Sequence, residues 1–207
     1  MMKEEIIALF DKQAAAYDSQ WERTSAIREC LHLLLDSILA DLSAQARVLC
    51  IGAGTGAEVL HLAGKNPGWH FTVVEPSLPM LEICEKKARA TGINGRCVFH
   101  GGYLESLEAK ELYDSATCFL VSQFILDTEA RSSFIREIAR RLRPGGLLVS
   151  TDLASDVGSG EYVELLGMWM QMMAGARVAE VERERIRRGY ARDVAVLPPG
   201  EIATIIQ

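Results

Sequence analysis

Hydrophobic positions recur at helical spacing through the first part of the chain. Within residues 3–44, apolar side chains return every three or four positions, as Leu31, Leu35, Ile38 and Leu42 do, and no strand-like alternation interrupts them. Because this spacing places apolar side chains on one face of a helix, we expect helices ahead of the first strand.

Short apolar runs then alternate with helical segments. Five runs are typical of strands, at 46–51, 71–75, 96–100, 115–122 and 146–153. Helical spacing fills the intervals at 58–63, 79–90 and 129–142, and Pro144 with the glycine pair after it ends the last of these helices. This alternation predicts an α/β fold, Rossmann-like and doubly wound, with a mainly parallel sheet and helices on both faces.

The chain returns to helical spacing at 158–192, where methionine and aromatic residues are frequent, and this stretch predicts two helices forming a lid. A turn at 197–201 opens one more short helix. We therefore expect a single domain over 1–207, divided into an N-terminal helical cap at 1–45, a core at 46–153, a helical lid at 154–192 and the start of a C-terminal part at 193–207.

Composition narrows the function classes. With 207 residues, 49% of them hydrophobic, the chain is large enough for one domain with a core. A net charge of -6 disfavours nucleic acid as a partner, because neutralising phosphates needs a surplus of lysine and arginine. No apolar run suits a signal peptide or a membrane span, so we expect no membrane partner and a cytoplasmic location. Cysteines and histidines show no metal-ligand spacing, so no metal site is predicted.

A glycine-rich loop follows the first predicted strand. In VLCIGAGTGAE (48–58), Gly52, Gly54 and Gly56 remove side chains that would keep a ligand away from the backbone. Glu75 ends the second strand, at a distance along the chain from which a carboxylate reaches both ribose hydroxyls. Loop and acid together indicate a cofactor that contains adenosine.

The loop by itself also fits the dinucleotide fingerprint, because Gly52, Gly54 and Ala57 satisfy G-x-G-x-x-G/A. An NAD(P)-dependent oxidoreductase is therefore an alternative. Such enzymes usually place the fingerprint close to the N-terminus, whereas here residues 3–44 precede it and can fold over the cofactor as a cap. This context favours a methyltransferase.

Six segments, in this order and spacing, resemble the class I S-adenosylmethionine-dependent methyltransferases, especially small bacterial members that act on metabolites or modified bases. They are FDKQAAAYDSQW (10–21), VLCIGAGTGAE (48–58), VVEPSLPML (73–81), HGGYLESL (100–107), FLVSQFIL (119–126) and RLRPGGLLV (141–149). The resemblance covers nearly the whole chain. It implies that 46–153 binds S-adenosyl-L-methionine, that S-adenosyl-L-homocysteine is the product, and that the acceptor is a small molecule methylated by direct displacement.

The resemblance also implies a set of cofactor-binding positions. They are Gly52, Ala53, Gly54, Glu75, Pro76, Ser77, Met80, Gly102, Tyr103 and Val121, and we add Glu58 because of its proximity in sequence to the glycine loop. The glycine loop would line the methionine and ribose, Glu75 would bind the ribose hydroxyls, and residues 76–80 would flank the adenine. Gly102 and Tyr103 stand where the family usually has an acidic and a small residue at the adenine edge.

Four residues are candidates for the substrate side. Gln123, at the end of the fourth strand, is the strongest of them. Tyr17 and Trp21 lie in the segment that closes over the site in relatives, and they either contact the substrate or anchor a helix. Trp169, with the methionines around it, either lines an apolar pocket or packs in the core. No catalytic residue is assigned, because the donor is already activated and positioning supplies much of the acceleration.

Two departures from the family pattern matter. Cys50 stands where the family commonly has an aspartate that helps to hold the methionine ammonium group, and Glu58 is the nearest carboxylate that can take over part of that role. The antiparallel hairpin that normally completes the family sheet is missing before Gln207, so the fifth strand would be an exposed edge and a homo-oligomer is possible.

A further alternative is binding or processing of a modified S-adenosylmethionine without methyl transfer. An arginine facing the sulfonium would distinguish this function from methyl transfer. The arginines of 183–188 are interleaved with glutamates, which is typical of a solvated helix face with ion pairs, although an anion-binding role stays open.

Overall fold

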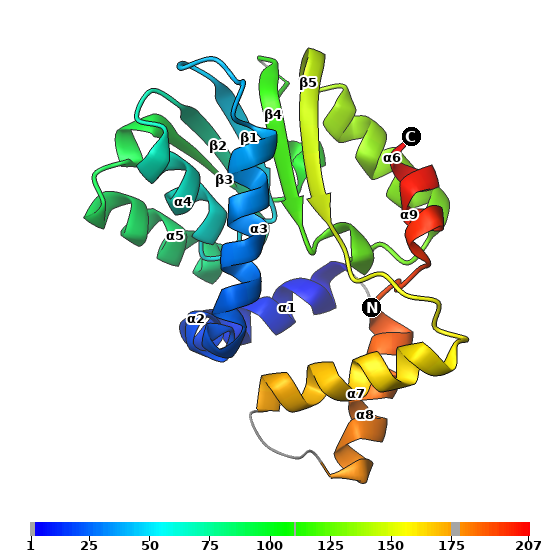
Figure 1. The fold of residues 1–207 in the computed structure, drawn as a ribbon. Helices are drawn as coiled ribbons and strands as arrows, with labels where there is room; N and C mark the ends of the chain where they lie inside the picture. Colours follow the sequence, from blue (N-terminus) through cyan, green and yellow to red (C-terminus); the bar gives the residue numbers. More distant parts are fainter. Residues whose placement is uncertain (1–2, 110, 175–178) are drawn as a thin grey trace.

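The computed structural model describes residues 3–109, 111–174 and 179–207 (Figure 1). Its centre is a five-stranded sheet in the order β3-β2-β1-β4-β5, and all four strand pairings are parallel. The strands are β1 (Arg47–Ile51), β2 (His70–Glu75), β3 (Cys97–Gly101), β4 (Tyr113–Phe119) and β5 (Leu142–Thr151). The predicted α/β fold with a parallel sheet is confirmed.

Helices surround the sheet in the order that the hydrophobic spacing predicts. Before β1 lie α1 (Lys3–Gln13), η1 (Ala14–Ala16), α2 (Tyr17–Gln20), η2 (Glu22–Thr24) and α3 (Ser25–Ile38). Between the strands lie α4 (Ala57–Lys65), α5 (Leu78–Ala90), η3 (Asn94–Arg96), η4 (Leu104–Ser106), η5 (Ser122–Phe124) and α6 (Thr128–Ala139). After β5 come α7 (Gly160–Ala174), α8 (Glu180–Asp193) and α9 (Pro199–Ile206).

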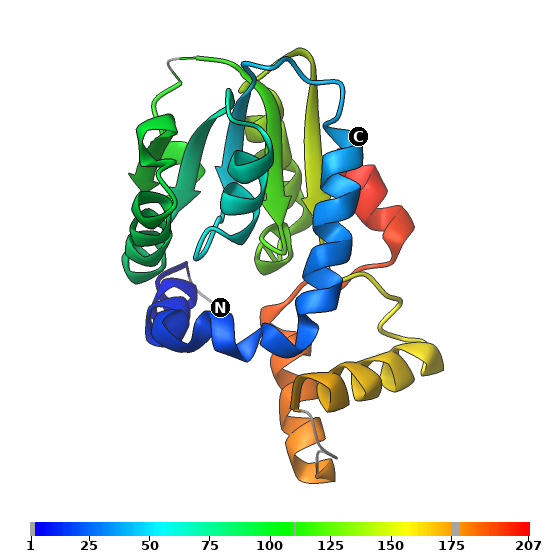
Figure 2. The ribbon, with the colours of Figure 1, turned by 60° about the vertical axis from the view of Figure 1, so that its left-hand side comes forward.

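Both faces of the sheet are buried under helices. Along β1, Val48 and Cys50 pack into a core that includes α3, α4 and α5, while Leu49 and Ile51 pack into a second core that includes α6 and α9. Successive side chains of a strand point to opposite faces, so an unbroken apolar run suits a strand covered on both sides. Figures 1 and 2 show α3 along one face, with α6 and α9 together on the other.

The last strand begins earlier than the sequence pattern predicts. The pattern predicts helix to residue 142 and strand from 146, but α6 ends at Ala139 and β5 starts at Leu142. The difference is an irregularity of the β4–β5 pairing next to Tyr113, and within it Gly145 has a φ of 78°. The proline–glycine run is thus an irregular stretch at the start of a strand rather than a loop before it.

The carboxyl ends of the strands and the N-terminal helices meet on one side of the molecule. Because β1 lies between β2 and β4, the chain crosses over there, and such a crossover leaves a crevice beyond the strand ends. The helices α1 and α2 lie below this edge, and α7 and α8 extend beyond them (Figure 1). Among the described residues, no helix is both long enough and apolar enough to cross a membrane.

The segment that carries α7 and α8 leaves the core and returns to it at neighbouring points. Ala154 and Leu197 form an isolated parallel bridge, and the N–H of Ser155 donates to the carbonyl oxygen of Leu197 at 3.0 Å. The N–H of Ala195 also donates to the carbonyl oxygen of Gln123 at 2.8 Å. Both ends of this helical excursion are therefore fixed beside the end of β5.

Candidate functional site

The turn after β1 takes a backbone conformation that glycine adopts without strain. Gly52, Gly54 and Gly56 have φ angles of 63°, 54° and 84°. The N–H of Gly52 donates to the carbonyl oxygen of Val74 at 2.8 Å, which ties the turn to β2. A Cβ atom at Gly52 would lie 2.3 Å from Cγ2 of Val121, whereas a Cβ atom at Gly54 would meet nothing within 4 Å. The turn is therefore tight at its start and open at its middle.

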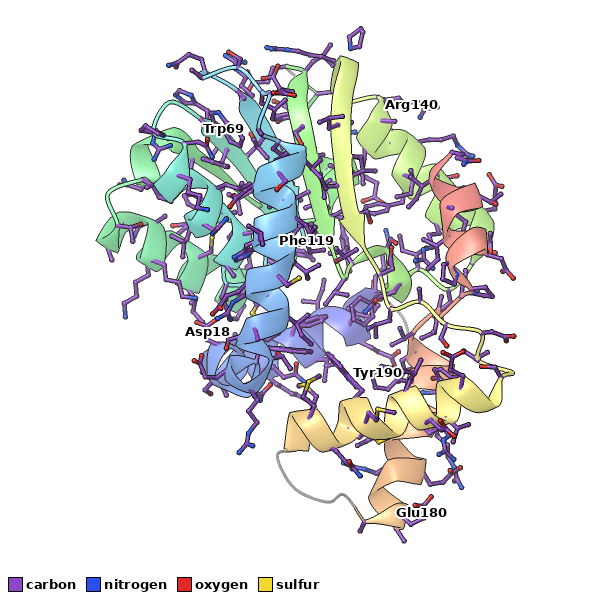
Figure 3. The ribbon with its side chains drawn as sticks, in the orientation of Figure 1. Asp18, Trp69, Phe119, Arg140, Glu180 and Tyr190 are labelled. Atoms are coloured by element: carbon purple, nitrogen blue, oxygen red, sulfur yellow. The ribbon has the colours of Figure 1, made fainter. Side chains whose placement is uncertain are left out.

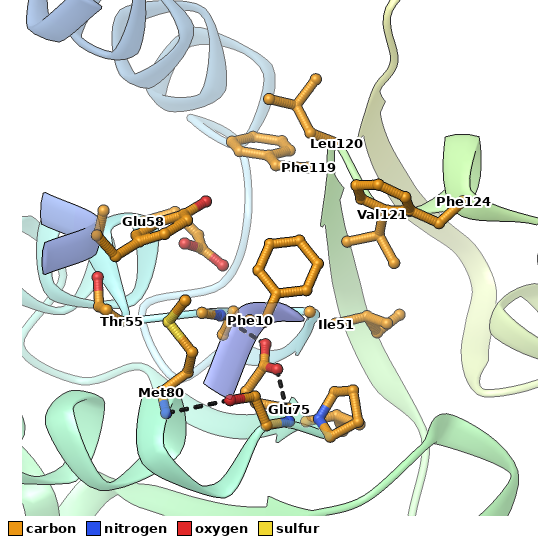
Figure 4. Close-up of a pocket in the computed structure, with 18 of the residues that line it drawn as sticks. Phe10, Ile51, Thr55, Glu58, Glu75, Met80, Phe119, Leu120, Val121 and Phe124 are labelled. Atoms are coloured by element: carbon orange, nitrogen blue, oxygen red, sulfur yellow. Dashed lines mark hydrogen bonds between the residues drawn. The ribbon is translucent and has the colours of Figure 1, made fainter. Parts of the chain in front are cut away.

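The carboxylate of Glu75 lies against the open part of this turn (Figure 4). Its Oε2 accepts a hydrogen bond from the N–H of Gly54 at 2.8 Å, and its Oε1 accepts one from the N–H of Ser77 at 2.9 Å. Burial raises the pKa of Glu75, and the two N–H donors oppose that rise. Each oxygen keeps a second lone pair, so the carboxylate can still accept hydrogen bonds from ligand hydroxyls.

A cavity of about 330 Å³ opens beside the turn and Glu75. Its walls come from the N-terminal helices, the turns after β1, β2, β3 and β4, and α7. All the predicted cofactor-binding residues line it, namely Gly52, Ala53, Gly54, Glu58, Glu75, Pro76, Ser77, Met80, Gly102, Tyr103 and Val121. Three of the four predicted substrate-side residues, Tyr17, Trp21 and Trp169, line it as well. Positions far apart in the sequence thus surround one space.

Five aromatic rings form a row along this cavity. From Phe124 the row passes to Phe10, Tyr17, Trp21 and Trp169, with centroid separations of 5.6, 6.4, 5.9 and 6.2 Å. The side chains of Tyr17 and Trp21 are half-buried, so they belong to the cavity wall rather than to a closed core. Phe10 was not singled out by sequence, although it belongs to the apolar stripe of the first helix; in Figure 4 it stands in the middle of the cavity.

Asp11 and Asp18 of the N-terminal segment bind side chains at the edges of the cavity. The hydroxyl of Ser77 donates to Asp11 at 2.6 Å, and the hydroxyl of Thr55 donates to Asp18 at 2.6 Å. Lys87 forms an ion pair with Asp18 at 2.6 Å. Although partial burial raises the pKa of Asp18, these two partners hold it below its ordinary value.

The first turn of α1 meets the loop after β3. The hydroxyl of Tyr103 donates to the carbonyl oxygen of Lys3 at 3.1 Å, and the Lys3 ammonium lies 4.6 Å from the centre of the Tyr103 ring. Lys3 also pairs with Glu105 at 3.1 Å, and both side chains are largely exposed. Exposed pairs of this kind contribute little stability, so the ring contact and the hydroxyl bond are the more specific links.

Glu58 is a buried acid in the cavity wall, 8% exposed, in the first turn of α4. Burial, with a smaller contribution from the charge of Glu75, raises its pKa to about 7. Burial, followed by the charges of Glu58 and Glu75, raises the pKa of Tyr17 to about 12. Cys50 is fully buried beneath the wall, and burial raises its thiol pKa well above the ordinary value, so it carries no charge.

The position of Gln123 does not match its predicted role. Gln123 is 4% exposed and does not line the cavity; its side-chain oxygen accepts a hydrogen bond from the N–H of Leu153 at 2.8 Å. The reason is the short helix η5, which starts directly after Val121 and turns the next side chains toward β5 and the C-terminal segment. Val121 and Phe124 from the same loop face the cavity instead.

A buried polar network lies behind this loop. Arg131 and Asp152 form an ion pair at 2.8 Å with side chains 1% and 3% exposed. The hydroxyl of Ser122 donates to Asp152 at 2.7 Å and accepts from Nε of Arg131 at 3.0 Å. Arg131 also donates to the carbonyl oxygen of Ala195 at 3.2 Å. The network fixes the loop after β4 to α6, β5 and the C-terminal segment.

For α7 and α8, which the sequence predicts as a lid, the structure shows where the methionines, Trp169 and the arginines lie. Trp169 lines the cavity, but Met168 and Met172 are 60% and 37% exposed, so these two neither line the cavity nor pack in the core. On α8, Glu184 pairs with Arg187 at 2.9 Å and with Arg188 at 3.3 Å. These contacts are the ion pairs within one helix that the alternation of arginine and glutamate predicts. The side chain of Arg183 lies outside the described residues.

Sequence reasoning missed one wall of the cavity. It comprises Phe119 and Leu120, at the end of β4, with Arg28 and Leu31 on α3. Leu120 has a φ of 57°, which is rare for a residue with a branched side chain. No local pattern links α3 to the end of β4, because the two are about ninety positions apart and adjoin only in the folded chain.

Part of the chain is similar in sequence to known methyltransferases. The profile of the methyltransferase domain family matches residues 48–146. An uncharacterized methyltransferase of Emericella nidulans is 28% identical over 124 residues, which are 55% of this chain and 43% of that protein. The malonyl-acyl-carrier-protein O-methyltransferase of Priestia megaterium is 26% identical over 157 residues, 75% of this chain and 52% of that protein. The chain spans about half the length of these relatives.

Solved structures show the same fold. A putative O-methyltransferase from Nostoc punctiforme has a TM-score of 0.67 at 16% identity, covering 95% of this chain and 52% of its own. A methyltransferase from Geobacter sulfurreducens, solved with S-adenosyl-L-homocysteine, has a TM-score of 0.58 at 20% identity, covering 84% and 60%. The cyclase SpnF has a TM-score of 0.60 at 22% identity, covering 84% and 56%. These likenesses concern the fold.

Proposed function

We propose that the chain is a class I S-adenosylmethionine-dependent methyltransferase, which the match of residues 48–146 to the methyltransferase domain family supports, and that it transfers a methyl group to a small molecule held in the cavity beside α1–α3. The observation that carries the proposal is the hydrogen bond from Gly54 to Glu75. It brings an open glycine turn and a buried carboxylate together in one cavity, which is the arrangement that a nucleoside with two ribose hydroxyls requires.

The residues present fit S-adenosylmethionine in shape and in donor chemistry. At Gly54 the backbone is open toward the cavity, and Glu75 keeps free lone pairs for the ribose hydroxyls. Pro76 and Met80 offer apolar surface for the adenine, and Gly102 offers backbone groups at its edge. Relatives of this fold include one solved with S-adenosyl-L-homocysteine, which supports the same cofactor here.

Glu58 is our candidate for holding the methionine ammonium group. It lines the cavity, it is buried, and no ion pair engages it within the described part of the chain. Cys50, which stands at the aspartate position of the family, is buried beneath the wall and neutral, so it cannot supply the negative charge. A buried carboxylate without a cation is costly, and a bound ammonium would remove that cost.

The chain's own contribution to catalysis is positioning. When bound, the sulfonium supplies an activated methyl group that needs no further activation by the protein. Val121 packs against Gly52 and fixes the wall beside the turn, and the rings of Tyr17 and Trp21 exclude water from the cavity. Tyr17 keeps its proton at neutral pH, because its pKa is raised to about 12, so it acts as a hydrogen-bond donor or as a wall and not as a base.

A modified S-adenosylmethionine remains the second candidate ligand, on one observation. Arg28 lines the cavity and carries a charge suited to an extra carboxylate on the cofactor. Mass spectrometry of the small molecule that copurifies with the protein separates the two, because the masses of the two cofactors differ.

Calorimetric titration with S-adenosyl-L-homocysteine, alongside NADH, tests the proposal. We expect binding of the first and none of the second. Transfer is then assayed as release of S-adenosyl-L-homocysteine in the presence of candidate acceptors. Binding of NADH without binding of S-adenosyl-L-homocysteine would contradict the proposal.

A further inference from the structure

We propose that the acceptor is a hydrophobic molecule with an anionic group, its apolar body packed against Trp21, Phe119, Leu120 and Trp169 and its anion paired with Arg28. This inference rests on the proposed function, because it names the class of molecule that shares the cavity with the cofactor. It draws on two separate features of the wall, its apolar surface and its charges.

The apolar surface lies away from the predicted cofactor residues. Phe119 and Leu120 enter the cavity from the end of β4, Trp169 from α7 and Trp21 from the N-terminal segment (Phe119 is labelled in Figure 3). Leu31 adds an aliphatic side chain from α3. Among the described residues, no asparagine or glutamine lines the cavity. A sugar or a nucleobase would leave its polar groups without partners on such a wall, whereas an aromatic or aliphatic body gains free energy by leaving water.

The charges of the wall are mostly taken by protein partners. Lys3 pairs with Glu105, and both oxygens of Asp18 are engaged, one by Thr55 and one by Lys87. Arg28 is half-buried, and within the described part of the chain it forms no ion pair. Its charge lowers the pKa of Asp18, but the Asp18 oxygens already have closer partners.

A second basic side chain lies one turn further along α3. His32 also lines the cavity, on the same helix face as Arg28. Its ring stacks on that of His61, with centroids 4.2 Å apart. Burial, followed by the charges of His61 and Arg28, lowers the pKa of His32 to about 4, so it is neutral at physiological pH. Arg28 is thus the permanent positive charge that the described wall leaves available to a ligand.

A single arginine in an apolar wall favours a carboxylate over a phosphate. One guanidinium binds a carboxylate through two parallel hydrogen bonds, whereas a doubly charged phosphate in an apolar cavity would need more than one cation. The cofactor also has a carboxylate, on its methionine part. The experiment therefore needs one arm for the acceptor and one for the cofactor.

The acceptor arm uses calorimetry on the protein saturated with S-adenosyl-L-homocysteine. The probes are octanoate and 4-phenylbutyrate, each compared with its uncharged amide. We expect the acids to bind about tenfold more tightly than the amides to the native chain, and we expect Arg28→Gln to remove that difference while Arg28→Lys retains part of it. Arg23→Gln, an exposed arginine of η2 outside the cavity wall, is the matched control and should change nothing.

The cofactor arm compares S-adenosyl-L-homocysteine with 5′-methylthioadenosine, which lacks the amino-acid part. If Arg28→Gln weakens only the first of these about tenfold, Arg28 holds the cofactor carboxylate and the proposal is overturned. Equal binding of acids and amides by the native chain, or binding of neither, overturns it as well. These outcomes differ from failure of the proposed function, in which S-adenosyl-L-homocysteine itself does not bind.

Discussion

The hydroxyl of Ser77 donates a hydrogen bond of 2.6 Å to the carboxylate of Asp11, joining the start of α5 to α1 across 66 positions of the chain. Ser77 also caps α5 by accepting from the N–H of Met80 at 3.4 Å. One side chain therefore starts the helix beside the part of the cavity where we propose that the cofactor binds, and it holds the N-terminal segment over it.

Loosening this link should speed release of the cofactor product. In Asp11→Asn the partner of Ser77 loses its charge, and a charged hydrogen bond is roughly twice as strong as a neutral one. We expect dissociation of S-adenosyl-L-homocysteine to become several-fold faster in stopped-flow displacement, with a smaller change in the association rate. Asp41→Asn, at an exposed position, is the control. An unchanged dissociation rate would show that α1 does not restrain the ligand.

Replacement of Glu75 should weaken the cofactor directly. In Glu75→Gln an amide nitrogen replaces one oxygen, so it faces the N–H of either Gly54 or Ser77 without a hydrogen bond. The affinity for S-adenosyl-L-homocysteine should fall by about ten- to a hundredfold in calorimetry. Glu82→Gln, on the exposed side of α5, should keep the native affinity. Equal affinities of the two variants would remove Glu75 from the site.

The role of Glu58 predicts a specific pH dependence. Its pKa is raised to about 7, so the folded, unliganded protein binds an extra proton between the ordinary pKa of 4.5 and about 7. That preference stabilises the fold below pH 4.5, and the stabilisation is lost as the pH rises through about 7. A bound ammonium group favours the ionised acid, so the affinity for S-adenosyl-L-homocysteine should rise from pH 6 to pH 8 with release of a proton.

Calorimetry in buffers of different ionisation enthalpy measures that proton release, and Glu58→Gln should abolish it. The same variant should melt at a more nearly constant temperature between pH 6 and pH 8 than the native chain. Native affinity in Glu58→Gln, with the pH dependence intact, would rule out contact between Glu58 and the ammonium group.

Two glycines of one turn should respond differently to alanine. Gly52→Ala and Gly54→Ala share a cost of about 1–2 kcal/mol for a left-handed backbone, but only the first places Cβ against Val121. Gly52→Ala should therefore lower the melting temperature more, and Val121→Ala should restore part of the loss. Gly54→Ala should instead reduce the affinity for S-adenosyl-L-homocysteine. Identical melting temperatures of the two variants would contradict this assignment.

The buried ion pair of Arg131 and Asp152 should affect stability mainly because removing one charge leaves the other without a partner. Removing one charge, as in Asp152→Leu, leaves Arg131 buried without a counter-ion and should cost about 3–5 kcal/mol in denaturant unfolding. The double variant Arg131→Met with Asp152→Leu should recover most of that loss. If the double variant is less stable than both single variants, the pair itself, and not the orphaned charge, provides the stability.

Sequence could predict that Gly54 and Glu75, which we propose bind the cofactor, lie together in the cavity, because local pattern places both of them. Gly54 and Glu75 end adjacent parallel strands, so the motif that identifies each of them also places them at one edge of the sheet. The strand pairing then brings them within hydrogen-bond distance without any further information from the chain.

The wall formed by α3 and the end of β4, where we propose that the acceptor binds, could not be predicted from local pattern. Arg28 and Phe119 line the same cavity because α3 packs on the sheet, which no spacing in the sequence encodes. Gln123 failed as a prediction because a single short helix, η5, decides which side chains of the loop face the cavity. The exposed Met168 likewise shows that apolar spacing on α7 does not reveal which helix face is covered.

The bridge between Ala154 and Leu197 puts the two ends of the segment that carries α7 and α8 side by side. The entropy cost of closing such a segment grows slowly with its length, by about 0.6 kcal/mol for each doubling. Such a segment can be exchanged for that of a relative, or diverge during evolution, while the sheet and the glycine turn keep their geometry. The wall that Trp169 contributes, where we propose that the acceptor binds, can therefore change without any change to Gly54 or Glu75.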